Sequence, residues 1–395
     1  MNVVYSEVPT EGGRAYIRAD EREALASISA LVFDCDGVLI DVRPSYDVAI
    51  SRTVRYLLSK LFYRDFSPLA TRRMIYRFRQ SGGFNNDWDT VCALLLGTFV
   101  QLDDALLRVF LETDEHLGGA FITEATERLI AYVREIRRKD AFVEAIRWRS
   151  PLNVHQARAR LLALADAADS SGLPSVERQI RESWELPSWK LTALSAFQRF
   201  LAYPGAMGES LVVTVFNEFF YGEEYCRTVF GIEPRFARGS GCVDHERPIL
   251  TDTVGRRLAA LFSGRLGIVS GRRRSTAEKT LGDRLTVFDS SALVFLEDEY
   301  DREHAESIGK PSPYGLLKAR SALGHPPALL YVGDSAEDFI MVRRAEMSGI
   351  RCLFCGVYRY GYNPGARIRL FMDAGAALIL PSVNELPGVL SSLKR

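Results

Sequence analysis

The chain has 395 residues, enough for two or three structural units, and its 47% hydrophobic and 25% charged residues are typical of a globular protein. Fifty basic residues balance fifty acidic ones, so the charge does not favour a nucleic acid as partner. The apolar runs are far shorter than the roughly 20 residues that span a bilayer, and we find no leader sequence. We therefore expect a cytoplasmic protein that binds neither nucleic acid nor membrane; its oligomeric state is not predicted.

A buried parallel strand is predicted near the start of the chain. Residues 1–27 carry no motif, and we assign no role to this N-terminal segment. The apolar run that begins at Ala30 ends in Asp34, Asp36 and Gly37, which is typical of a strand that opens into a loop. In open α/β sheets, chemistry takes place at such strand ends.

The rest of the chain divides into a helical part and an α/β part. Apolar residues in 43–243 recur at steps of three and four, which predicts helices. Beyond Asp244, strands alternate with helical segments, and we expect them at 266–269, 292–296, 329–332, 351–354 and 377–380. We predict an α/β fold, a Rossmann-like parallel sheet with helices on both faces. Residues 28–42 and 244–395 would form its core, and 43–243 a large inserted α-helical cap domain.

Six scattered cysteines are too few for a disulfide scaffold. Only Cys352 and Cys355 form a C-x-x-C pair, and they lie in an apolar stretch that indicates a buried strand. No second pair completes a zinc site, so we favour packed core thiols over a redox or metal role.

The first candidate site motif is Asp34-Cys35-Asp36-Gly37. Two carboxylates that follow a strand at positions i and i+2 can reach one cavity, one as nucleophile and one as general acid/base. Gly37 would allow the backbone to turn. The alternative is a polar loop after a strand.

The second motif is Ser270-Gly271-Arg272, directly after the apolar strand at 266–269. A hydroxyl group and free backbone N–H groups at a strand end can bind phosphate oxygens, whereas Ser-Gly is also an ordinary turn. Arg272 is a candidate for binding a second anionic group of a substrate. A solvated helix start rich in arginine is the alternative for that residue.

The third motif contains Lys310, just before a helical pattern over 314–322. Pro311 disfavours a helical Lys310, so the lysine is expected in a loop near the helix start. Its ammonium group could neutralise a carboxylate nucleophile and a bound phosphate together. A solvated surface lysine is the alternative.

The fourth motif contains Asp334 and Asp338, which follow the strand at 329–332. Two aspartates four residues apart present hard oxygen ligands on one face of a helical turn, which suits Mg²⁺. Helix capping by Asp334 is an alternative that does not exclude metal binding.

Together the four segments resemble the motifs of the haloacid dehalogenase superfamily, in the phosphatase-like branch whose helical cap is inserted after the first motif. The resemblance covers about 28–42 and 244–390. It implies that Asp34 is the nucleophile that becomes an aspartyl phosphate. It also implies that Asp36 protonates the leaving oxygen and then activates water.

The same resemblance implies a magnesium site and a phosphate site. Mg²⁺ would be held by Asp34, the main-chain carbonyl of Asp36 and Asp334, and Asp338 would support the metal or its waters. Phosphate would be bound by Ser270, Gly271 and Lys310. Members of the family that cleave carbon–halogen bonds lack an aspartate at the position of Asp36, so the resemblance points to phosphatases and phosphomutases.

A segment of the predicted cap is a candidate for substrate binding. Residues 82–89 combine glycines, amides, acids and an indole, which could close over a polar phosphorylated substrate. We name Asn85, Asn86 and Trp88 as candidate substrate residues. The alternative is a helix–helix turn with a capping residue and a packed Trp88.

These expectations define one function and two rivals. We expect a magnesium-dependent phosphomonoester hydrolase that acts through an aspartyl phosphate on a small phosphorylated metabolite. A phosphomutase would use the same residues and return the phosphoryl group to substrate. A non-catalytic phosphate-ligand-binding protein is the other alternative, but a binder needs no nucleophile and acid together.

Overall fold

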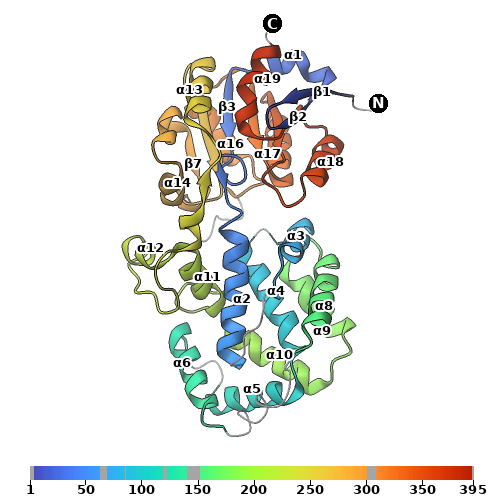
Figure 1. Ribbon diagram of the computed structural model, residues 1–395, viewed down its shortest axis with the longest axis vertical. Coiled ribbons are helices and arrows are strands. Elements are labelled where there is room, and N and C mark those ends of the chain that lie inside the picture. The colour runs from blue at the N-terminus through green and yellow to red at the C-terminus, as the bar shows by residue number, and fades with distance from the viewer. Residues whose placement is uncertain are drawn as a thin grey trace. The chain divides into compact units, whose positions relative to one another are not determined.

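The computed structural model describes residues 4–62, 69–84, 86–118, 122–139, 152–299 and 308–393. Its contacts divide the chain into two compact units (Figure 1). The first, here the sheet unit, consists of Met1–Arg43 and Glu246–Arg395. The second, the helical unit, consists of Pro44–His245. The chain therefore leaves the sheet unit after its first strands and returns to it some 200 residues later.

An eight-stranded sheet forms the centre of the sheet unit, in the order β1-β2-β10-β9-β8-β3-β6-β7. The six strands from β10 to β7 in this order are parallel, with β3 between β8 and β6. The predicted Rossmann-like α/β fold is confirmed. The strands are β1 (Tyr5–Thr10), β2 (Gly13–Arg18), β3 (Ala30–Phe33), β6 (Leu266–Ser270), β7 (Leu293–Phe295), β8 (Leu329–Gly333), β9 (Cys352–Val357) and β10 (Leu378–Leu380).

The first residues of the chain, to which the sequence assigned no role, extend this sheet. β1 and β2 form an antiparallel hairpin in which Thr10 pairs with Gly13, and β2 pairs antiparallel with β10. The Tyr5 hydroxyl donates a hydrogen bond of 2.8 Å to the Ala376 carbonyl. A local signal was present in the sequence, because two adjacent glycines such as Gly12 and Gly13 favour a tight hairpin turn.

Helices cover both faces of the sheet (Figure 1). Successive residues of a strand point to opposite faces, so Leu31 and Phe33 of β3 join one apolar cluster while Ala30 and Val32 join the other. The first cluster is completed by α1 (Arg22–Ala26), α13 (Asp252–Leu261), α14 (Arg274–Leu281) and α19 (Leu386–Leu393). The second is completed by α16 (Tyr314–Ala322), α17 (Ala336–Met347) and α18 (Pro364–Ala374).

The two cysteines of the C-x-x-C pair face opposite sides of β9. Cys352 packs in one apolar cluster and Cys355 in the other, as expected for residues three apart in a strand. Burial raises the pKa of both thiols. This placement fits core packing and gives no support to a shared metal or redox role.

A second, two-stranded sheet lies where the chain leaves and re-enters the sheet unit. β4 (Ile40–Asp41) and β5 (Arg247–Pro248) pair antiparallel, and the Ile249 N–H donates a 2.7 Å hydrogen bond to the Leu39 carbonyl. Both crossing segments are therefore held next to the loop that follows β3.

The helical unit is built on one large apolar cluster. In α2 (Tyr46–Phe62), the buried Ile50, Val54, Leu57 and Leu61 recur at three- and four-residue steps, as an amphipathic helix requires. The remaining described helices are α3 (Arg72–Gln80), α4 (Asp87–Phe99), α5 (Asp104–His116), α6 (Ala125–Ile136), α8 (Val154–Asp166), α9 (Leu173–Ser183), α10 (Ser188–Leu201), α11 (Leu211–Tyr221) and α12 (Glu223–Thr228).

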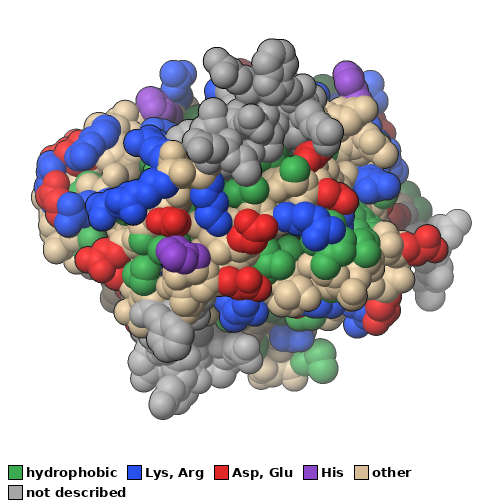
Figure 2. All heavy atoms as spheres, turned by 90° about the horizontal axis from the view of Figure 1, so that it is seen from below, with side chains coloured by type: hydrophobic (Ala, Val, Ile, Leu, Met, Phe, Trp, Pro, Cys, Tyr) green, Lys and Arg blue, Asp and Glu red, His purple; other side chains and the backbone are tan. Residues whose placement is uncertain are grey.

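The described helices can be tested for membrane-spanning segments, and the surface for patches of one charge. No single described helix is long and apolar enough to cross a membrane; α4 and α5 together meet the same criteria of length and composition but bend by 116°. On the face shown in Figure 2, basic and acidic side chains lie interspersed rather than gathered by sign.

Candidate active site

Three neighbouring parallel strands bring the predicted site residues of the sheet unit together. Phe33 at the end of β3 pairs with Val332 of β8 on one side and Ile268 of β6 on the other. The Asp34 N–H continues this ladder with a 2.9 Å hydrogen bond to the Val332 carbonyl. Because the strands are parallel, their carboxyl ends meet at one edge of the sheet, and Asp34, Ser270 and Asp334 lie there.

The loop after β3 is a tight turn that requires a glycine. The carbonyl of Cys35 accepts hydrogen bonds from the N–H groups of Val38, Leu39 and Ile40. Gly37 has φ +73°, a conformation that L side chains rarely adopt, and a Cβ there would lie 2.1 Å from Asp334 Oδ2. The glycine therefore lets the loop close directly against the Asp334 carboxylate.

Lys310 joins two of the predicted carboxylates. Its Nζ atom lies 2.8 Å from Asp34 Oδ1 and 2.8 Å from Asp338 Oδ1. Burial alone would lower the pKa of Lys310, but Asp338 and Asp34 raise it well above its usual value. Burial raises the pKa of Asp34 to about 8, although Lys310 opposes this shift. The structure thus places Lys310 beside the predicted nucleophile and not on the solvated surface.

Asp338 is wholly buried and accepts hydrogen bonds at both oxygens. Its Oδ1 accepts from Lys310 Nζ at 2.8 Å and Tyr331 Oη at 3.1 Å. Its Oδ2 accepts from the N–H groups of Asp334 and Ser335 and from the Ser335 hydroxyl. Ser335 and Asp338 form a capping box at the start of α17, so the capping residue is Ser335 and the alternative of capping by Asp334 is wrong.

Three carboxylates come close enough to share a cation. One oxygen each of Asp34, Asp334 and Asp338 can be chosen so that all lie within 4.8 Å of one another. Carboxylate oxygens are the hard ligands that Mg²⁺ prefers. Arg367 Nη1, from α18, also lies 2.7 Å from Asp334 Oδ2. Arg367 belongs to none of the four motifs, and no pattern in the sequence pointed to it.

Arg272 belongs to a buried ion-pair network that the sequence did not predict. Its Nη1 lies 2.8 Å from Asp36 Oδ1 and its Nη2 2.7 Å from Glu246 Oε2, while Nε donates to Thr276 Oγ1 at 3.1 Å. The side chains of Arg272 and Glu246 are 1% and 0% exposed. Arg272 was expected either to bind a second anionic group or to be solvated. Its buried contacts fit neither expectation, and we no longer assign it to substrate.

Ser270 and Gly271 lie at the end of β6. Ser270 is only 2% exposed, and its hydroxyl oxygen accepts a long hydrogen bond of 3.5 Å from the Arg272 N–H. A Cβ atom at Gly271 would meet no atom within 4 Å. The two residues keep the predicted position at the strand end beside Asp34, and their role in phosphate binding stays a prediction.

The candidate substrate residues of the helical unit have structural contacts. Asn86 caps α4 by accepting a 2.9 Å hydrogen bond from the Trp88 N–H. Trp88 Nε1 donates to Asn217 Oδ1 at 3.2 Å, and the indole meets the ring of Phe216 edge to face. Asn85 lies outside the described residues. These contacts fit the alternative of capping and packing, and substrate contact stays a prediction.

Replacing Trp88 tests that alternative. Trp88→Ala should lower the free energy of unfolding by about 2–3 kcal/mol, because a large, partly buried side chain and its hydrogen bond are lost. Urea unfolding followed by circular dichroism measures the change. Trp88→Phe, which keeps a ring against Phe216, should lose less. A loss from Trp88→Ala within about 0.5 kcal/mol of wild type would count against packing.

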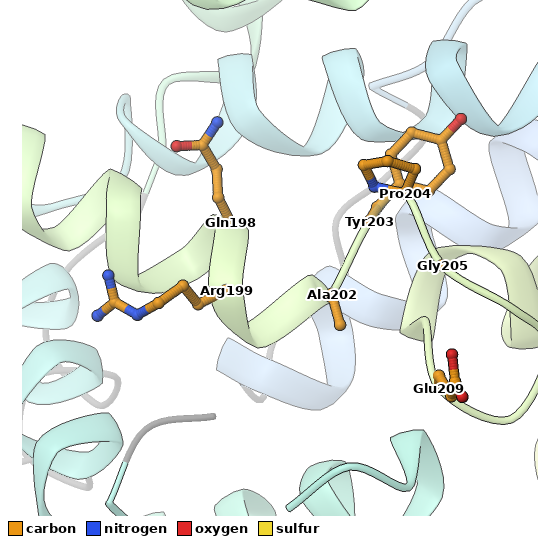
Figure 3. A pocket seen from close by; sticks show the side chains of 7 residues that line it. All are labelled: Gln198, Arg199, Ala202, Tyr203, Pro204, Gly205 and Glu209. Carbon is orange, nitrogen blue, oxygen red and sulfur yellow. The ribbon is translucent and has the colours of Figure 1, made fainter. Parts of the chain in front are cut away.

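A surface pocket of 410 Å³ lies in the helical unit around the end of α10 (Figure 3). Its lining includes Tyr203, whose hydroxyl donates a 2.6 Å hydrogen bond to Asp89 Oδ1. In Figure 3 the side chains of Gln198 and Arg199 extend away from Tyr203 and Pro204. None of the candidate site residues lines this pocket, which is formed by Gln198, Arg199, Ala202, Tyr203, Pro204, Gly205 and Glu209.

Comparison with known proteins supports the resemblance drawn from the motifs. Residues 235–346 match the family described as haloacid dehalogenase-like hydrolases. This segment includes Ser270, Lys310 and Asp334, so the resemblance of the later motifs is confirmed. No curated protein matches the chain.

One solved structure shares its general fold, and two others are weaker matches. A structural genomics target aligns with a TM-score of 0.58 and 15% identity, covering 93% of this chain and 99% of that chain. The phosphatase Tt82 from Thermococcus thioreducens aligns with a TM-score of 0.46 and 20% identity, covering 87% of this chain and 99% of that chain. A HAD family hydrolase from Deinococcus radiodurans R1, with bound phosphate and sodium, has a TM-score of 0.33 and 14% identity over 93% of this chain and 97% of that chain.

Proposed function

We propose that this chain, a member of the haloacid dehalogenase-like hydrolases, is a magnesium-dependent phosphatase that cleaves phosphomonoesters of small metabolites through an aspartyl phosphate. One observation carries the proposal. Lys310 Nζ lies 2.8 Å from both Asp34 and Asp338, at the carboxyl ends of adjacent parallel strands. A nucleophilic carboxylate and a fixed ammonium group are thereby held at one point, as phosphoryl transfer requires.

The residues present fit a magnesium ion. Asp34, Asp334 and the main-chain carbonyl of Asp36 would hold it, and Asp338 would act through Lys310 and the start of α17, because both its oxygens accept hydrogen bonds. Gly37 is consistent with this site, since any Cβ there would collide with the Asp334 carboxylate. When bound, Mg²⁺ would offset the repulsion between the anionic phosphate and the anionic nucleophile.

In the first half of the reaction, an oxygen of Asp34 attacks phosphorus as the ester bond breaks. Lys310 neutralises the charge on Asp34 and on the phosphoryl oxygens. Asp36, whose side chain is 30% exposed, gives its proton to the leaving oxygen, so that an alcohol departs. The products of this half are the alcohol and the phosphorylated Asp34.

In the second half, Asp36 takes a proton from water as the water oxygen attacks phosphorus. The bond between Asp34 and phosphorus breaks, inorganic phosphate leaves, and both aspartates return to their starting state. Of the two carboxylate oxygens of Asp36, Arg272 binds Oδ1 in the described contacts. Glu246 and Thr276 in turn accept hydrogen bonds from Arg272. We therefore assign Arg272 to orienting the acid/base.

The experiment that tests the proposal is release of inorganic phosphate from a panel of phosphorylated metabolites, with and without Mg²⁺. The panel should include sugar, polyol, nucleoside and hydroxy-acid phosphates, with Asp34→Asn as the blank. We expect magnesium-dependent release that is fastest with one substrate class. Transfer of phosphate between positions of a substrate, without release, would favour the phosphomutase instead. Binding without either reaction would favour the non-catalytic alternative.

Removal of Asp334 tests the proposed metal site. Asp334→Ala should weaken Mg²⁺ binding by at least about tenfold, because a largely buried carboxylate ligand is lost. Isothermal titration with Mg²⁺ measures the affinity without turnover. Asp373→Ala, which removes an exposed carboxylate from α18, is the control and should leave the affinity unchanged. An unchanged affinity in Asp334→Ala would place the metal elsewhere.

A further inference from the structure

Arg367 lies beside the Asp334 carboxylate. Its Nη1 atom lies 2.7 Å from Asp334 Oδ2, and the two side chains are 21% and 15% exposed. The guanidinium also lies against the main chain at Gly361, where a Cβ atom would come within 2.3 Å of Arg367 Nε. A residue larger than glycine at 361 would displace the arginine. Glycine at 361 therefore leaves room for the arginine side chain that contacts Asp334.

The cations of the site are divided among its carboxylates. Lys310 is shared by Asp34 and Asp338, and Arg272 is shared by Asp36 and Glu246. Within the described part of the chain, the ion pair of Asp334 is formed with Arg367. Burial raises the pKa of Asp334, and Arg367 opposes this shift by favouring the ionised carboxylate.

We propose that Arg367 is a resident counter-ion of Asp334 with which Mg²⁺ must compete, so that this arginine sets the affinity of the site for the metal. The inference rests on the proposed function, because it takes Asp334 as a metal ligand. Two effects act in the same direction. The guanidinium engages an oxygen of the carboxylate, and its positive charge repels a second cation in a buried site.

This role differs from that of a residue that orients a metal ligand. An orienting arginine would raise metal affinity, and its loss would weaken binding. A competing counter-ion lowers metal affinity, and its loss strengthens binding. We expect the second role, in which loss of Arg367 raises metal affinity. Removing Arg367 leaves Asp334 without its paired cation and makes the cluster of carboxylates more negative.

The test is isothermal titration of the metal-free full chain with Mg²⁺ alone, at one fixed pH and ionic strength. Arg367→Gln should bind Mg²⁺ about tenfold more tightly than wild type. Arg369→Gln is the matched control, since it removes the same charge from an exposed position two residues further along α18. Circular dichroism and thermal unfolding establish that both variants are folded.

Each outcome decides the inference. Tighter binding in Arg367→Gln but not in Arg369→Gln supports it, and the gain should vanish when Asp334→Ala is added, because the gain acts through that carboxylate. Equal or weaker binding in Arg367→Gln, while wild type still binds Mg²⁺, overturns the inference and leaves the proposed function intact. Absence of Mg²⁺ binding in every protein overturns both, since the metal site itself would then be wrong.

Discussion

Asp34→Asn should leave less than about 1% of wild-type phosphate release, because an amide cannot act as the nucleophile and loss of a nucleophile costs several orders of magnitude. The fold should be retained. Asparagine has nearly the shape of aspartate, and the hydrogen bond that ties this residue to β8 comes from its main-chain N–H. Phosphate release and thermal unfolding, measured on the same preparation, test the two statements together.

A trapping experiment makes the role of Asp34 more specific. Acid quenching of the wild-type enzyme during turnover of a substrate with a radiolabelled phosphoryl group should leave label on the protein, and Asp34→Asn should carry none. Activity in Asp34→Asn above about 1% of wild type, or label on the variant, would contradict the assignment. Asp289→Asn, which alters an aspartate that caps a 3-10 helix outside the four motifs, is the control.

Arg272→Met should lower the free energy of unfolding by about 3–5 kcal/mol, because it leaves the buried Glu246 carboxylate without the guanidinium that now lies 2.7 Å away. Methionine keeps much of the volume of the arginine chain and removes its charge. Urea unfolding measures the loss. Adding Glu246→Gln should restore part of the stability, since the stranded charge is then removed. Additive losses in the double variant would contradict a coupled pair.

The same substitution should affect catalysis in a way that depends on the leaving group. If Arg272 orients Asp36, alkyl phosphates, which need protonation of the leaving oxygen, should lose about 100-fold or more in kcat. Aryl phosphates, whose leaving oxygen departs as an anion, should lose much less. Arg272→Lys should recover part of the alkyl activity. An equal loss with both classes would indicate a general structural defect and not misplacement of the acid.

The strands and the four motifs could be predicted because each rests on a local pattern. A buried parallel strand is a short apolar run, and its polar residues follow at the strand end, so Asp34, Ser270 and Asp334 could be placed together. The ion pairs could not be predicted. Arg367 and Asp334 are 33 residues apart, and Arg272 and Asp36 are 236 apart. Such pairs form only in the tertiary fold. The hydrophobic periodicity of a segment does not show which distant residue it will contact.

The position of Lys310 could be predicted only in part. Pro311 predicted that Lys310 lies in a loop. The sequence could not show whether that loop packs the lysine between two buried carboxylates, as the structure has it, or leaves it on the surface. The hairpin of β1 and β2 is the opposite case, because the glycine pair at its turn is a local signal that was not used. What was missed thus divides into contacts at long range and one local pattern.

The pairing of β4 with β5 has a consequence for how this chain can change during evolution. Asp41 pairs with Arg247 and Ile40 with Pro248, so the points at which the helical unit begins and ends are neighbours. A two-residue turn could join such strands directly. The entropy of closing a loop grows only slowly with its length, by about 0.6 kcal/mol for each doubling. An insertion anchored in this way can be lengthened, shortened or replaced, while Asp34 and Asp334 stay at the ends of strands that the exchange does not break.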